Sequence, residues 1–186
     1  MNGNDSDAFR QEAALRVMRI VVSALMIGIL SFLGIVIFLV QQREPNPNQQ
    51  IIISYIAIGF FAIILVSWWV VPDLMMNNSI ERIAAGTWTA GTDRDDQGVS
   101  SRNFPTDASK LLVVYQVKTI VASGLLEGAA FFGCIAYLQE GQVYTLGVPG
   151  VVLALMALTF PTRDRVNQWV EMQERRIQEK RAFRGE

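Results

Sequence analysis

Histidine is absent from this chain of 186 residues. Its absence removes the commonest general base, the usual haem axial ligand and most zinc-site chemistry. Serine–histidine–aspartate and cysteine–histidine mechanisms cannot be built either. Cysteine occurs once, at Cys134, so neither an intrachain disulfide nor a thiolate-held metal cluster can form. We therefore expect no catalytic residues, no metal site and no cofactor, and a protein that is not an enzyme.

Charge is scarce as well. Only 18% of the residues are Asp, Glu, Lys or Arg, whereas 51% are hydrophobic, and an average soluble domain is about 25% charged. The formal net charge of −1 indicates no nucleic-acid partner. The deficit is concentrated in long uncharged stretches, and this distribution predicts a protein that crosses a lipid bilayer.

Four apolar stretches are long enough for helices that cross a membrane, which takes about 20 residues each. They are residues 20–40, 51–71, about 111–138 and about 143–160. The first two carry no charged side chain, the third contains Lys118 and Glu127, and the fourth is short. The sequence predicts an all-α membrane protein with four transmembrane helices, arranged as two hairpins at 20–71 and 111–160.

The flanking Lys and Arg residues set the orientation, because cytoplasmic segments carry an excess of them. Residues 1–19 carry three, residues 72–110 four and residues 161–186 seven. The connections near 41–50 and 139–142 carry one and none. We expect a multi-pass protein of the cell inner membrane with its N-terminal tail, central loop and C-terminus in the cytoplasm.

The central loop is polar and contains Asp93, Asp95 and Gly98, which open like a calcium-binding loop. Phe104 stands at the twelfth position, where a bidentate Glu is needed, so we interpret the segment as a solvated turn. Residues 79–85 favour a short helix, and Ile80, Ile83 and Trp88 are expected to lie against the membrane surface.

Pro105 followed by Thr106 or Asp107 is typical of a helix start. The 32 residues from Asp107 to Leu138 would make a helix about 48 Å long. The hydrocarbon core of a bilayer is only about 30 Å thick. The third helix is therefore expected to project into the cytoplasm at its N-terminal end.

The C-terminal segment from Thr162 onward predicts a basic amphipathic helix. Its apolar stripe consists of Val166, Trp169, Val170, Gln173 and Ile177. Three roles are open for residues 162–184: a helix on anionic lipid, a helix that packs with a protein partner, and an ordinary cytoplasmic tail.

Glu127 is the acidic residue expected inside a span, about 10 Å deep if the membrane begins at Ile120. A carboxylate there costs several kcal/mol unless it is protonated, paired or hydrated, and such residues are functional candidates. Gln116, Thr119 and Ser123 share its helical stripe, so these four are the candidate ion-handling residues. Two roles are open: proton or cation handling, and a protonated Glu that hydrogen-bonds across a helix interface.

Small residues predict close packing of the helices. Gly124 and Gly128 form a GxxxG pair, Gly133 repeats the spacing from Ala129, and Gly147 and Gly150 line one side of the fourth span. The motif is common in membrane helices, so it indicates packing, including packing in a homo-oligomer, without identifying a partner.

The segment from Lys118 to Phe132 resembles the carboxylate helix of rotary ATPase c subunits, in which an essential Glu or Asp carries a proton or sodium ion. The resemblance covers 15 of the 186 residues and implies that Glu127 is the carrier. No span here has that family's repeated Gly-x-Gly pattern, and a fourth span follows. The whole chain resembles small uncharacterised bacterial four-span membrane proteins with the same Leu-Leu-Glu-Gly-Ala-Ala segment, which implies no activity.

These features predict a non-enzymatic structural or interaction component of the membrane. The alternative is a proton- or cation-handling component that uses Glu127. An intramembrane enzyme ranks third, because Glu127 has neither a histidine nor a second intramembrane acid to work with.

Overall fold

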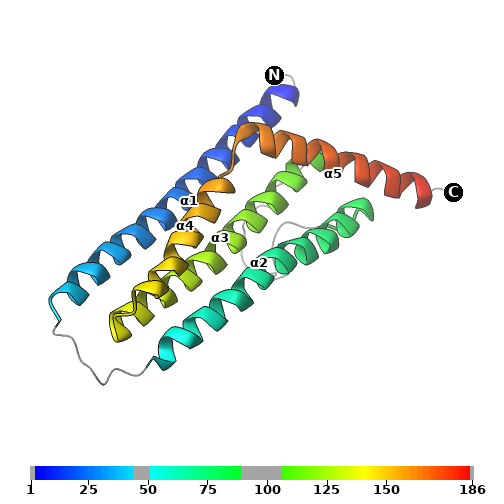
Figure 1. Ribbon diagram of the computed structural model, residues 1–186. Helices are drawn as coiled ribbons and strands as arrows, with labels where there is room; N and C mark the ends of the chain where they lie inside the picture. Colours follow the sequence, from blue (N-terminus) through cyan, green and yellow to red (C-terminus); the bar gives the residue numbers. More distant parts are fainter. Residues whose placement is uncertain (1–2, 44–50, 89–105, 185–186) are drawn as a thin grey trace, which may run out of the picture. The chain divides into compact units, whose positions relative to one another are not determined.

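The computed structural model describes residues 3–43, 51–88 and 106–184, with side chains for 11–43, 51–88 and 106–182. This described part is helical, without a strand (Figure 1). Its elements are α1 (Gly3–Gln41), α2 (Ile52–Ala84), α3 (Asp107–Glu140), the 3₁₀ helix η1 (Val143–Leu146), α4 (Gly147–Leu158) and α5 (Arg163–Arg184). The calcium-like segment at 93–104 lies outside the described residues.

Three described helices are long and apolar enough to cross a membrane: α1 from Gln11 to Gln41, α2 and α3. A fourth candidate arises only when η1 and α4 are counted together with α5 across the break at 159–162. Several membrane-spanning helices are thus supported by length and composition. The number four, the pairing into hairpins and the orientation stay predictions.

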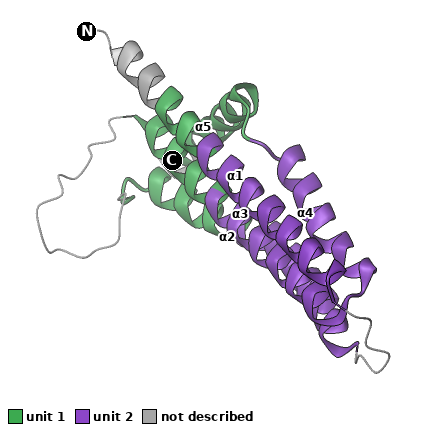
Figure 2. Cartoon of the chain, turned by 90° about the vertical axis from the view of Figure 1, so that its left-hand side faces the viewer, with its two compact units in different colours: residues 1–18, 73–119, 161–186 green, residues 19–72, 120–160 purple. Residues whose placement is uncertain are grey.

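The chain divides into two compact units (Figure 2). Unit 1 comprises residues 1–18, 73–119 and 161–186, and unit 2 comprises residues 19–72 and 120–160. The first three helices contribute residues to both units, whereas α4 belongs to unit 2 and α5 to unit 1. The charged residues of unit 2 are Arg19, Arg43, Glu44, Glu127 and Glu140. All other charged residues belong to unit 1, so the division follows the apolar and polar parts of the sequence.

Unit 2 is held together by contacts among all four of its helices. Its main buried cluster consists of Val22, Ile29, Ile64, Leu126, Ala129, Ala130, Val152 and Met156. Edge-on aromatic contacts join Phe32 of α1 to Phe131, and Phe60 of α2 to Phe132, each with ring centroids 5.2 Å apart. Lipid tails are as apolar as these side chains, so close van der Waals fit is what favours such packing in a bilayer.

Unit 1 has a separate apolar core that draws on α1, α2, α3 and α5. It consists of Leu15, Met18, Met76, Ile80, Ile83, Leu111, Leu112, Val114, Val166, Val170 and Ile177. The predicted helix at 79–85 exists, but it is the continuation of α2 beyond Pro72. Ile80 and Ile83 are 3% and 0% exposed within this core, so their expected position on a membrane surface is wrong. The continuing helix places Met76, Ile80 and Ile83 on one face, which packs against protein.

The predicted start of α3 and the predicted stripe of α5 are both confirmed. The helix begins at Asp107, where the Thr106 hydroxyl accepts the backbone N–H of Ser109 at 3.3 Å as an N-terminal cap. Its 34 residues would extend about 51 Å. On α5 the stripe residues are buried or half-buried against the core of unit 1. The apolar face of α5 is therefore covered by the same chain.

Candidate functional site

Glu127 lies on α3 within unit 2, and its carboxyl group sits beside Gly28 of α1. A Cβ atom added to Gly28 would lie 3.7 Å from Oε1 of Glu127, which is ordinary van der Waals contact. The side chain is half-buried, and no described residue forms a hydrogen bond or ion pair with it. The glycine thus leaves room for the carboxyl group, and the described residues supply no hydroxyl partner for it.

The other candidate ion-handling residues do not all accompany Glu127. Ser123, one turn earlier on α3, is buried in unit 2, whereas Gln116 and Thr119 belong to unit 1. The Thr119 hydroxyl donates to the backbone carbonyl of Tyr115 at 2.9 Å. The predicted polar stripe is therefore divided between the two units, and one of its hydroxyl groups is occupied by its own helix.

Lys118 forms an ion pair within unit 1. Its Nζ lies 3.2 Å from Oδ1 of Asp73 on α2. The two side chains are partly exposed, at 28% and 58%, so the pair adds little to stability. Lys118 thus pairs with an acid of α2 and not with Glu127 of its own helix.

The five glycines predicted to mediate packing fall into two groups. A Cβ atom on Gly133 would lie 2.9 Å from Cβ of Val148 and 3.2 Å from Cδ of Pro149, so only glycine allows this approach of α3 and α4. The other four have no atom within 4 Å of an added Cβ and face away from the described chain. They are Gly124, Gly128, Gly147 and Gly150. Their packing role stays a prediction.

One end of unit 2 is closed by two side chains at helix termini. The carboxylate of Glu140, at the end of α3, accepts the backbone N–H groups of Ile53 at 2.5 Å and Ser54 at 2.8 Å. These are unpaired donors in the first turn of α2, where a negative charge also offsets the helix dipole. Arg43, just after α1, donates to the carbonyls of Leu138 at 3.0 Å and Gln139 at 3.4 Å. Both contacts join residues far apart in the sequence, so sequence reasoning missed them.

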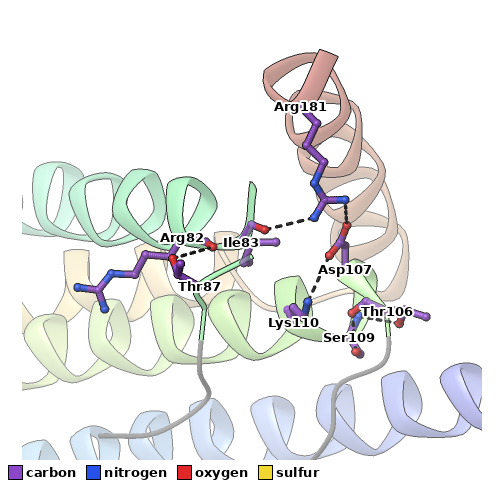
Figure 3. Close-up of polar contacts among 8 residues, drawn as sticks. All are labelled: Arg82, Ile83, Thr87, Thr106, Asp107, Ser109, Lys110 and Arg181. Atoms are coloured by element: carbon purple, nitrogen blue, oxygen red, sulfur yellow. Dashed lines mark hydrogen bonds and ion pairs between the residues drawn. The ribbon is translucent and has the colours of Figure 1, made fainter. Parts of the chain in front are cut away.

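A comparable arrangement occurs in unit 1 around Arg181 of α5 (Figure 3). The Arg181 guanidinium lies 2.7 Å from Oδ2 of Asp107, in the first turn of α3, and donates to the carbonyl of Ile83 at 3.2 Å. Lys110 approaches the other oxygen of Asp107 at 3.5 Å. One side chain of α5 thus satisfies a carbonyl at the end of α2 and an acid at the start of α3.

In the described ranges, no group of three or more His, Cys, Asp or Glu side chains is placed to hold a metal ion. No protein-family model matches the chain, and no curated protein or solved structure matches it either. Interpretation therefore rests on the geometry of the two units.

Proposed function

We propose that this protein is a multi-pass inner-membrane protein with a non-enzymatic structural or interaction role, in which membrane spans carry a helical cytoplasmic unit. The observation that carries the proposal is the core of unit 1. Eleven buried apolar residues from four helices pack together, and all except Leu111, Leu112 and Val114 lie outside the four apolar stretches predicted to cross the membrane. A chain that served only as an anchor would not need this second core, whereas a component that presents a folded surface would.

The composition of unit 1 supports the proposal of four spans with both termini in the cytoplasm. A compact unit lies on one side of a membrane, and its three segments are those with an excess of Lys and Arg. The intervening residues 19–72 and 120–160 must therefore each cross an even number of times. If α3 crosses once, η1 and α4 make the return. Together they would extend about 26 Å, close to the roughly 30 Å of a hydrocarbon core.

Cysteine labelling tests this topology. In a Cys134→Ala background, Gln142→Cys should react with a membrane-impermeant maleimide in intact spheroplasts. Gln178→Cys, on an exposed part of α5, should react only after the membrane is permeabilised. Labelling of Gln178→Cys in intact spheroplasts would indicate three spans and would contradict the proposal.

A second candidate function is proton or cation handling by Glu127. The half-buried carboxyl group beside Gly28, without a polar partner among the described residues, supports this role over that of a packing hydrogen bond. A carboxyl group that served interhelical packing would be expected to meet a donor or acceptor on the neighbouring helix.

Ion flux separates the two functions. Proteoliposomes with the wild-type protein and with Glu127→Gln are compared under imposed proton, sodium and potassium gradients. The structural role predicts the same leak for both as for protein-free vesicles. Ion flux that occurs with the wild-type protein and is absent with Glu127→Gln would overturn the structural role and support ion handling.

The partner surface of α5 is proposed to be its charged face. The apolar stripe is buried in unit 1, so contacts with anionic lipid or with a protein would use exposed basic side chains such as Arg175, Arg176 and Lys180. Each basic residue near an anionic surface contributes about 1 kcal/mol. Anionic lipid and a protein are the two partners proposed for this face of residues 162–184.

A further inference from the structure

Unit 1 contains a cavity of 270 Å³ among α1, α3 and α5. Its apolar wall includes Leu112 and Val170, and its polar atoms come from Gln11, Ser109, Asn167 and Glu171. A water molecule occupies about 30 Å³ in the liquid, and drug-sized pockets begin near 300 Å³. The cavity is therefore suited to a compact small molecule.

The hydrogen bonds already made by the lining residues determine what the cavity offers. The Ser109 hydroxyl donates its proton to the carbonyl of Thr106 at 2.7 Å, which leaves the lone pairs of Oγ as acceptors. Gln11 donates through Nε2 to Oδ1 of Asn167, so its own Oε1 remains an acceptor. Glu171 contributes two carboxylate oxygens, and no described side chain forms an ion pair with it. Apart from the amide N–H groups of Asn167 and Gln11, the polar groups that line the cavity are acceptors.

Further acidic residues lie near the cavity, and one of them, Asp107, is paired with Arg181 and Lys110. Glu174 follows Glu171 by one helical turn, and Asp107 precedes the cavity-lining part of α3. The pKa of Glu174 lies above its ordinary value, first because the group is partly buried and then because Asp107 and Glu171 carry like charges. The Glu171 carboxylate disfavours an anionic ligand, and a single lining carboxylate with neutral acceptors is a poor ligand set for a divalent metal.

We infer that this cavity binds a small organic cation with a primary ammonium group, paired with the Glu171 carboxylate and hydrogen-bonded by Ser109 and Gln11. An ammonium group has three donors and no acceptor, which matches an acceptor-rich cavity. The apolar wall at Leu112 and Val170 accommodates its methylene carbons. This site is independent of the function proposed for the membrane spans and of the charge state of Glu127.

Isothermal titration calorimetry of the full-length protein in detergent micelles tests the inference, with 1,4-diaminobutane as the probe. Saturable binding is expected for the wild-type protein. Glu171→Gln should weaken it by at least about tenfold, because it removes a charge-assisted hydrogen bond. Butane-1,4-diol, which has a similar length and no charge, should not bind.

Glu179→Gln is the matched control, because it removes the same charge from an exposed residue two turns further along α5 and should leave the affinity unchanged. Circular dichroism confirms that each variant is folded. The inference is overturned if the wild-type protein shows no saturable binding of the diamine, if the diol binds equally well, or if Glu171→Gln and Glu179→Gln bind the diamine with the same affinity.

Discussion

Glu140 and Ser54 lie 86 positions apart in the sequence, yet a carboxylate oxygen of Glu140 accepts the backbone N–H of Ser54 at 2.8 Å. The acid thereby caps the first turn of α2 from the end of α3. Glu140 is 4% exposed, so the bond is shielded from competing water. The same end of unit 2 contains Arg43, which satisfies carbonyls at the end of α3. Polar groups at three helix ends are thus paired across the chain.

Removing this cap should destabilise unit 2. Glu140→Gln loses the negative charge and one of the two acceptor oxygens, so we expect the unfolding midpoint to fall, as it does when a helix cap is removed. Thermal unfolding in detergent, followed by circular dichroism, measures the change. Glu179→Gln, on an exposed part of α5, is the control and should change stability by less than about 0.5 kcal/mol. Equal midpoints for the two variants would rule out the capping role.

The two groups of glycines should respond differently to alanine. Gly133→Ala places Cβ 2.9 Å from Val148 and should destabilise the protein by about 1–3 kcal/mol through overpacking. Gly128→Ala has open space around it and should be neutral, or stabilising by up to about 1 kcal/mol because alanine favours helix. Thermal unfolding measures the stability change of both variants.

Size-exclusion chromatography with light scattering extends this comparison. A homo-oligomer packed through Gly128 would dissociate in Gly128→Ala and keep its mass in Gly133→Ala if that variant folds. An unchanged mass for Gly128→Ala would contradict a role of this glycine in oligomer packing.

The charge on Glu174 should make unit 1 less stable as pH rises. Its folded-state pKa is raised above the ordinary value of 4.5, chiefly by burial and further by Asp107 and Glu171. The folded state therefore binds the proton more tightly than the unfolded state. Protonation of Glu174 contributes stability to the folded state below pH 4.5, and this contribution is lost as pH rises through the folded-state pKa. Glu174→Gln should stabilise the protein at pH 7 by about 0.3 kcal/mol and give no gain near pH 4. If Glu174→Gln gives the same gain in stability at both pH values, the gain does not arise from the charge on Glu174.

The space beside Glu127 should control its reactivity. Gly28→Leu fills the position that faces the carboxyl group of Glu127, 3.7 Å from an added Cβ. We expect carbodiimide modification of Glu127 to fall several-fold, as read by mass spectrometry. Gly34→Leu, on the same helix with no neighbour within 4 Å, should leave the modification unchanged. If both variants are labelled as strongly as the wild-type protein, the carboxyl group is reached from another direction.

Local features of this chain were predictable, because they depend on neighbouring residues. The start of α3 follows from Thr106 and Asp107, and the buried face of α5 follows from the spacing of Val166, Val170 and Ile177. The spacing of apolar residues along a helix could not show whether protein or membrane covers the apolar face. Ile83 was therefore assigned to a membrane surface, although it packs against protein.

Features that depend on distant residues were missed. Arg43 counted in the sequence only as a charge that sets orientation, yet it contacts a carbonyl 95 positions away. Glu140 counted only as part of a short loop. The spacing of glycines likewise could not distinguish Gly133, which meets α4, from Gly128, which meets nothing in the described chain. Glu127 was identified because a charge in an apolar run is visible locally, but its neighbour Gly28 was not.

Arg181 holds Ile83 and Asp107 at the same time, and these two residues flank the central connection of the chain. Arg181 of α5 therefore joins the two sides of that connection from outside it. The entropy of closing a flexible loop grows only logarithmically with its length, and doubling the length costs about 0.6 kcal/mol. An epitope or a fluorescent protein inserted between Gly91 and Thr92 should thus be tolerated by both units.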